Sequence, residues 1–387
     1  MNEPVGSRQA NLSRLLRIVH LEGPVSRATL TGATNLNRST IADLVGDLVS
    51  LGLVEEHAPD PSRRVGRPSP LVAPHPRVAA IAVNPEVDAV TIATVGLDRR
   101  VSRRRRVEMT GLVSPERTTE LIAEYIELQR DEGAGELALA GIGIAVPGLV
   151  RAADGLVRDA PHLKWTDIAL REMVEAATGL HTVVGNDAGL GVVAEHLFGA
   201  ARGVDDIVYL NGGASGIGGG LIVNGMPVAG ASGYSGEFGQ NRPGIASNDD
   251  RRASNGVLED EVSQARLLAV LGRENADEPE LARLLRTTRS ADVADEIARQ
   301  RRILSTALAN AVNVLNPAVV VLGGFLAMLA ADDPDALTRA VVAQTMHANG
   351  EDLEIRSAAL AEDRLLIGAA EAAFAELLRD PAGATPT

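Results

Sequence analysis

Two consecutive stretches decide the fold: TVVGNDAGLGVVAEHLFG (residues 182–199) and DIVYLNGGASGIGGGLIVNG (residues 206–225). The first predicts a short strand, a turn at Asn186-Asp187 and a helix over 188–198. The second predicts a new strand, a glycine-rich turn over 212–216, and a further strand that ends in an Asn-Gly hairpin turn. A strand–helix pattern that stops and then restarts predicts two similar α/β halves with a cleft between them.

The flanking sequence extends this pattern in both directions. Apolar, β-rich runs predict strands over 78–83, 90–95, about 103–109, 141–146 and 318–322. Helical periodicity predicts helices over 115–129, 170–178, 258–271, 279–285, 291–315 and 365–378. At 387 residues the chain is long enough for two or three domains.

Composition narrows the class of protein. The chain has no cysteine, which excludes disulfides, thiolate zinc sites and cysteine nucleophiles. The sequence contains no uncharged apolar run long enough for a membrane span, and no apolar signal region precedes the first helix. We therefore expect a cytoplasmic protein without membrane contact. The net charge is −14, yet residues 1–78 carry nine arginines against seven acidic residues. An acidic body with a mildly basic head favours contact with DNA at the N-terminus alone.

The head has helix–turn–helix spacing. Helices are predicted over 9–22 and from Ser26 to about Ala33, and Asn37 or Ser39 can cap the next one. The expected buried face of that third helix is Ile41, Leu44, Val45, Leu48 and Leu51. Its first turn therefore exposes Arg38, Ser39 and Thr40, where a recognition helix meets base edges and phosphates. Spacing alone also allows a three-helix module that contacts other proteins.

The segment 57–77 contains six prolines, which exclude a helix interior, and four arginines against one aspartate. We interpret it as a wing followed by a linker. Arg63, Arg64 and Arg67 are the expected DNA contacts, because arginines favour the negative potential of a narrow minor groove. A solvated linker with incidental arginines is the alternative.

Polar residues with the chemistry of a binding site lie farther along the chain. Asn186 and Asp187 follow a strand end, where α/β folds place ligand groups. Glu237 lies next to Gly236, and Glu259 lies at the start of a helix. Carboxylates that converge on a cleft suit a polyhydroxylated, uncharged ligand. Taken singly, each acidic residue is more often a surface charge or a helix cap than a ligand contact.

The motifs GLHTVVGNDAGLGVVAEHLFG, DIVYLNGGASGIGGGLIVNG, GYSGEFGQ and GVLE occur in this order after the head, and together they resemble the ROK family of repressors and sugar kinases. The resemblance implies a two-lobed, actin-like (ribonuclease H-like) α/β ATPase fold, preceded by an all-α/winged-helix DNA-binding domain. The implied domains are 1–75 for the winged helix–turn–helix with its basic wing, 76–187 plus the helix at 365–380 for the first lobe, and 188–364 for the second.

The resemblance also implies roles for individual residues. The implied sugar contacts are Asn186, Asp187, Glu237, Gln240 and Glu259. Asp187 matches the catalytic base of the family's kinases, and Gln240 stands where the family pattern has a zinc-binding histidine.

The chain departs from the kinases in two places. The segment Asn84–Ala89 occupies the position of the ATP phosphate loop, but it has no glycine, and Glu86 and Asp88 would repel phosphate. The three cysteines of the family zinc site are absent. We therefore expect no catalytic residue, no metal, no structural zinc and no ATP. Charged residues of the 240–257 loop are expected to pair among themselves: Arg242, Asp249, Asp250, Arg251 and Arg252.

The sequence thus predicts a sugar-responsive transcriptional regulator, most simply a repressor of carbohydrate-use genes. Its expected partners are operator DNA, an unphosphorylated sugar and further copies of itself as a homodimer or homotetramer. One alternative is a sugar kinase that phosphorylates a hexose with ATP. Another is a DNA-binding protein whose pocket is vestigial.

Overall fold

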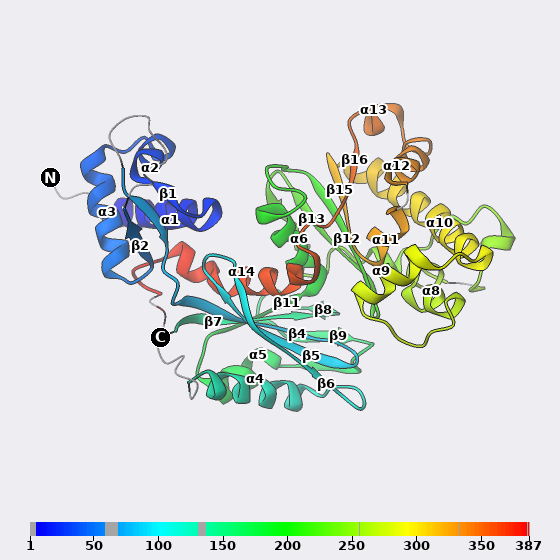
Figure 1. Ribbon diagram of the computed structural model, residues 1–387, viewed down its shortest axis with the longest axis horizontal. Helices are drawn as coiled ribbons and strands as arrows, with labels where there is room; N and C mark the ends of the chain where they lie inside the picture. The colour runs from blue at the N-terminus through cyan, green and yellow to red at the C-terminus, as the bar shows by residue number, and fades with distance from the viewer. Residues whose placement is uncertain are drawn as a thin grey trace.

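The computed structural model describes residues 5–58, 69–130, 137–254, 256–331, 333–384 and 386. A helical head packs against the first of two α/β lobes. Helix α6 (Asp187–Phe198) lies between the first lobe and the second (Figure 1). Among the described residues, no helix combines the length and the apolar character needed to cross a membrane.

The head consists of three helices and a small antiparallel sheet. Its helices are α1 (Val5–Glu22), α2 (Arg27–Thr34) and α3 (Arg38–Ser50), and its sheet has the order β1 (Val25–Ser26), β3 (Leu71–Pro74), β2 (Val54–His57). Of the two expected caps for α3, Asn37 is the cap, because its Oδ1 accepts the Thr40 N–H at 2.8 Å. The wing-and-linker prediction missed strand β3. Arg63, Arg64 and Arg67 lie outside the described residues.

The two lobes repeat one sheet topology. The first sheet has the order β6 (Val101–Glu108), β5 (Ala89–Gly96), β4 (Val78–Pro85), β7 (Ala138–Val146), β11 (Thr182–Asn186). The second has the order β14 (Met226–Pro227), β13 (Gly216–Val223), β12 (Ile207–Gly213), β15 (Val319–Gly324), β16 (Glu354–Ser357). In both, an antiparallel meander is followed by two parallel strands. The prediction of two similar halves is confirmed.

Helices cover both sheets (Figure 1). In the first lobe these are α4 (Pro115–Gln129), α5 (Leu170–Thr178) and α14 (Arg364–Arg379), with α6 (Asp187–Phe198) between the lobes. In the second they are α7 (Leu258–Glu261), α8 (Gln264–Val270), α9 (Glu278–Thr287), α10 (Ala291–Leu315), α11 (Phe325–Ala330), α12 (Pro334–Val342) and α13 (His347–Gly350).

Three sequence predictions need correction. The single helix expected over 258–271 is two helices, because Val262 and Ser263 are extended and Ser263 caps α8 through the Arg266 N–H. The glycine-rich turn expected over 212–216 is shorter, since β12 and β13 pair up to Gly213 and Gly216. A small sheet was not predicted: β8 (Leu149–Val150), β9 (Val157–Ala160) and β10 (Trp165–Ile168).

The head and the first lobe share a hydrophobic core. Leu12 and Leu16 of α1 belong to the same buried cluster as Phe374 and Leu377 of α14. Polar contacts follow the same seam: the Ser13 hydroxyl donates to the Leu378 carbonyl at 2.6 Å. The head is therefore packed onto the first lobe rather than tethered to it by a linker alone.

Candidate functional site

The first part of the candidate site lies where β11 ends and α6 begins. Asn186 caps α6: its Oδ1 accepts the Gly189 N–H at 2.8 Å, and its Nδ2 donates to the Gly148 carbonyl at 2.9 Å. Asp187 is the first residue of α6, and its carboxylate accepts the Ala188 N–H at 2.7 Å. Burial outweighs this hydrogen bond and the charge of Arg364, and raises the pKa of Asp187 to about 6.

Along the chain, Glu237 lies between the end of β11 and the start of α7, next to the short 3-10 turn Phe238–Gln240. Burial raises the pKa of Glu237 to about 7, and the nearby carboxylates of Asp187 and Glu259 act in the same direction. Glu237 is therefore within electrostatic reach of two acidic side chains that come from other segments, Asp187 and Glu259. At neutral pH, Glu237 is divided between a protonated form that donates a hydrogen bond and an ionised form that only accepts.

Glu259 is held by two neighbours. Its Oε1 accepts the Gln240 side-chain amide at 2.6 Å, and its Oε2 accepts the Ile217 N–H at 3.1 Å. Gly216 makes this approach possible, since a Cβ there would lie 2.4 Å from Glu259 Oε2 and the backbone has φ +105°. The fold thus places Asp187, Glu237, Gln240 and Glu259 in one neighbourhood, while the amide of Asn186 is bonded to the protein's own backbone.

The β4–β5 turn contains the segment Asn84–Ala89. Its geometry is that of a closed hairpin, in which the Glu86 N–H donates to the Ala89 carbonyl at 2.7 Å. Arg106 of β6 pairs with Glu86 at 3.2 Å and with Asp88 at 3.1 Å. Burial raises the pKa of Glu86, while Arg106 lowers it and Asp88 and Glu278 raise it further. Glu86 of this turn is therefore within electrostatic reach of Glu278 in the second lobe.

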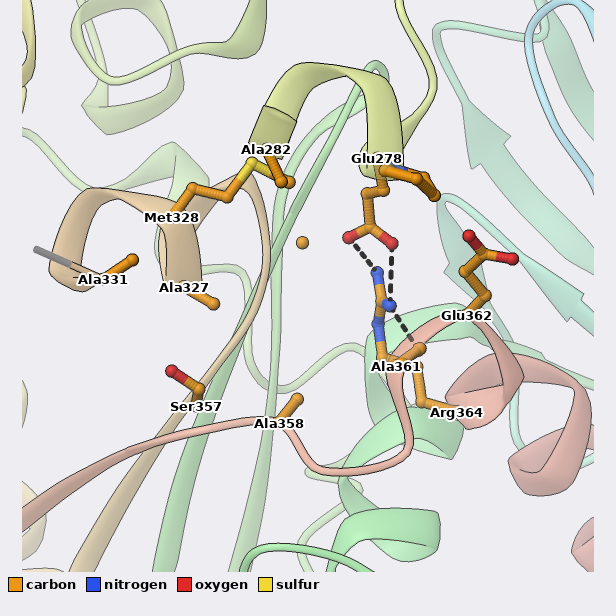
Figure 2. Close-up of a pocket in the computed structure, with 12 residues that line it drawn as sticks. Glu278, Ala282, Ala327, Met328, Ala331, Ser357, Ala358, Ala361, Glu362 and Arg364 are labelled. Atoms are coloured by element: carbon orange, nitrogen blue, oxygen red, sulfur yellow. Dashed lines mark hydrogen bonds and ion pairs between the residues drawn. The ribbon is translucent and has the colours of Figure 1, made fainter. Parts of the chain in front are cut away.

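A separate cavity of about 330 Å³ lies between α9, α11 and the start of α14 (Figure 2). Its lining is largely apolar and includes Ala282, Ala327 and Met328. One wall is an ion pair in which both terminal nitrogens of Arg364 donate to Glu278 at 3.0 Å. None of the five predicted sugar contacts lines this cavity, and sequence periodicity gave no signal for Arg364.

The start of α3 carries the other candidate site. Arg38 and Ser39 are exposed and Thr40 is half-buried. The Ser39 hydroxyl donates to Asn37 Oδ1 at 2.6 Å, which fixes the first turn of the helix. The structure therefore presents the three residues that the sequence singled out at the helix N-terminus.

Charged residues of the 240–257 loop interact with α10 as well as with each other. Asp250 pairs with Arg302 of α10 at 2.7 Å, and its pKa is lowered chiefly by Arg302 and also by Arg299 and by Arg252 of its own loop. A buried pair, Glu261 with Arg299, joins α7 to α10 at 3.1 Å. No group of three or more His, Cys, Asp or Glu side chains within the described ranges is placed to hold a metal ion.

Comparisons with known proteins agree with this architecture. A model described as the ROK family matches residues 80–376. The xylose repressor of Caldicellulosiruptor bescii is 24% identical and covers 97% of this chain and 98% of its own length. The xylose repressor of Bacillus subtilis is 30% identical over 60% of each chain. A crystal structure of a ROK family transcriptional regulator, a homologue of the E. coli Mlc protein, has 23% identity, 97% coverage of both chains and a TM-score of 0.76.

Proposed function

The chain belongs to the ROK family and is a sugar-responsive transcriptional repressor, and we propose that its effector is an unphosphorylated sugar held in the interlobe cleft. The proposed contacts are Asn186, Asp187, Glu237, Gln240 and Glu259. The observation that carries this proposal is that Glu237 lies close enough to both Asp187 and Glu259 for their charges to add to the burial that raises its pKa.

The chemistry of the cluster favours a neutral, polyhydroxylated ligand. Carboxylates accept hydrogen bonds from sugar hydroxyls, and a protonated Glu237 also donates one. A phosphate group would add negative charge to a site that already raises the pKa of Glu237 to about 7. A pentose, a hexose or an amino sugar therefore fits better than a sugar phosphate.

The DNA contacts that we propose are Arg38, Ser39 and Thr40 of α3 together with Arg63, Arg64 and Arg67 of the wing. The exposed first turn of α3 supports the first three. The wing residues follow from their sequence alone. Because a helix–turn–helix reads two half-sites as a symmetric pair, we propose a homodimer or homotetramer that acts in the cytoplasm on operator DNA.

We propose that helix α6 links the two proposed sites. It begins at Asp187, one of the proposed sugar contacts, and ends at Phe198, whose ring packs edge-on against His20 of α1 with a centroid distance of 5.5 Å. A sugar that favours one lobe arrangement would move α6 relative to α14 and so reposition the head. Such coupling requires only that the sugar binds the two arrangements with different affinity.

We further propose that the protein does not use ATP and holds no structural zinc. The closed hairpin at Asn84–Ala89 supports the first point, because its acidic side chains occupy the place of a phosphate loop. The absence of cysteine supports the second. The alternative function, a hexose kinase, has one observation in its favour: Asp187 stands at the position of the kinase base.

Calorimetric titration tests the proposal. Unphosphorylated pentoses, hexoses and amino sugars, and their phosphates, are titrated into the purified protein and into Glu259→Ala. We expect at least one unphosphorylated sugar to bind the wild type and to bind the variant far more weakly. Absence of heat with every sugar would favour a vestigial pocket instead. Formation of a sugar phosphate with Mg-ATP, lost in Asp187→Asn, would establish the kinase.

A further inference from the structure

Arg299 of α10 lies at the centre of a buried polar network behind the candidate sugar site. Its side chain is 2% exposed, and the Glu261 side chain is fully buried. All five guanidinium N–H groups have acceptors: two go to the Glu296 carboxylate, one to the Glu261 carboxylate, and one each to the backbone carbonyls of Glu261 and Asp250. A buried arginine with every donor used is a built feature rather than a surface pair.

Glu261 extends the network into the loop over 240–257. Its carboxylate accepts the Arg252 N–H at 2.9 Å and the Ala253 N–H at 2.9 Å, in addition to the Arg299 guanidinium. The loop thus returns to α7 through backbone amides, and Arg299 holds the Asp250 carbonyl at 2.8 Å. Two charged side chains therefore fix the path of the loop over residues 250–253.

The same helix carries the candidate ligand contact. α7 spans only Leu258–Glu261, so Glu259 and Glu261 lie two residues apart, one facing the site and the other facing the network. Gln240, which donates to Glu259, is the first residue of the loop, and Glu261 accepts backbone amides near the end of the same loop. Leu258 is also tied to the loop, because its N–H donates to the Asn241 carbonyl at 2.8 Å.

A metal does not fit this place. The loop has no cysteine, Gln240 stands at the histidine position of the family's zinc pattern, and the carboxylate nearest the loop is already occupied by two amides and a guanidinium. The chemistry of these partners is that of an ion pair with backbone hydrogen bonds rather than that of a zinc site.

We propose that the Glu261–Arg299 pair is a metal-free clamp that holds the 240–257 loop against α7 and so positions Gln240 and Glu259 for the sugar. Neither clamp residue touches the ligand; both are positioning residues. The inference rests on the proposed sugar site, and it predicts that sugar affinity depends on a buried ion pair instead of on a bound metal.

The test uses the full-length protein and three variants. Arg299→Lys keeps the charge but loses the planar fork, and Glu261→Gln keeps one acceptor but removes the charge. Arg283→Ala is the control, because it removes an exposed arginine whose partner, Glu280, lies on the same helix α9, and it leaves both the buried pair and the loop intact. The readouts are calorimetric affinity for the sugar that binds the wild type, hydrogen exchange of the Arg252 and Ala253 amides, and thermal unfolding.

We expect both clamp variants to unfold cooperatively, to lose protection at these two amides, and to bind the sugar about tenfold or more weakly, as the loss of buried hydrogen bonds implies. Arg283→Ala should match the wild type in sugar affinity and in amide protection. Wild-type sugar affinity should survive treatment with a chelator. If the clamp variants bind sugar like the wild type, or if the chelator abolishes binding, the inference is wrong.

The two proposals fail in distinguishable ways. If the wild type binds none of the sugars, the proposed effector fails, and the positioning role fails with it. Hydrogen exchange still reports on the clamp in that case, because it needs no ligand. Should the Arg252 and Ala253 amides stay protected in Glu261→Gln and Arg299→Lys, the clamp itself is refuted even if sugar binds.

Discussion

His20 of α1 and Glu371 of α14 form a buried pair, with 2.9 Å between Nε2 and Oε1. The other ring nitrogen, Nδ1, lies 2.7 Å from the Leu97 carbonyl oxygen. Both partners are acceptors, so only the protonated imidazolium donates to both. Burial lowers the pKa of His20 and Arg99 acts in the same direction, but the charge and hydrogen bond of Glu371 together with the hydrogen bond to Leu97 outweigh both, and the net effect is a raised pKa.

A raised pKa makes the docking of the head pH-dependent. The stabilisation is complete below the unfolded value of 6.5 and is lost as the pH rises through the folded pKa of His20. We expect the free energy of unfolding to fall across this window, as measured by denaturant titration at a series of pH values. His20→Ala should remove the dependence and cost about 3 kcal/mol near pH 6, because Glu371 is left buried without a partner.

Glu237→Gln should separate stability from ligand binding. The folded pKa of Glu237 is raised from 4.5 to about 7, so the free energy of unfolding falls as the pH rises from 4.5 to about 7 and stays at the lower level above that. With solvent screening, we expect the variant to gain about 1 kcal/mol at pH 8 and almost nothing at pH 5. Sugar affinity should fall at both. Equal thermal midpoints of variant and wild type at pH 8 would contradict this account.

Gly216→Ala should displace Glu259. The added Cβ would meet the Glu259 carboxylate, and we expect a loss of sugar affinity of about tenfold or more in calorimetry. Gly203→Ala is the control, because Gly203 also has positive φ but has open space where a Cβ would lie. Both variants should lose about 1 kcal/mol of stability through backbone strain. Only Gly216→Ala should lose sugar.

Arg38→Ala should weaken operator binding. The loss expected for one base or phosphate contact is about 1–3 kcal/mol, measured by fluorescence anisotropy on a duplex selected by the wild type from a random library. Arg339→Ala serves as the charge-matched control, since its side chain is 69% exposed on α12 of the second lobe. If Arg38→Ala binds DNA as tightly as the wild type, the prediction is wrong, and the head is better interpreted as a three-helix module that contacts other proteins.

Phe374→Ala should destabilise the head and the first lobe together. Phe374 is fully buried in the cluster that they share, and the truncation should cost about 3–5 kcal/mol. Operator binding should be lost at a lower temperature than in the wild type. Phe325→Ala is an equally large truncation in the core of the second lobe. In this variant, the temperature at which operator binding is lost should be closer to that of the wild type.

The sequence predicted the elements whose signal is local. Helices at Pro115–Gln129, Leu170–Thr178 and Ala291–Leu315 agree with the structure at both ends, because their apolar periodicity is long or their ends are marked by residues such as Ser114 and Gly179. The break between α7 and α8 was missed, since apolar residues continue at helical spacing across the extended Val262 and Ser263.

The features that the sequence could not indicate depend on distant residues. Arg299 and Glu261 are separated by 38 positions, and His20 and Glu371 by 351. No periodic pattern connects such pairs, and a charged side chain in a helix is more often solvated than buried. Asp187, Glu237 and Glu259 could be predicted as neighbours only because each occurs in a motif, and these motifs follow one another in a fixed order along the chain.

The packing of α1 against α14 has a consequence for synthesis of the protein. Gln9 and Ser13 bond to residues at the α14 end, and the separations along the chain are 371 and 365 residues. The head therefore leaves the ribosome before its docking surface, which is translated more than three hundred residues later. A chain that stops before α14 carries the three helices of the head without the surface that they pack against, so that docking of the head waits for synthesis of the last helix.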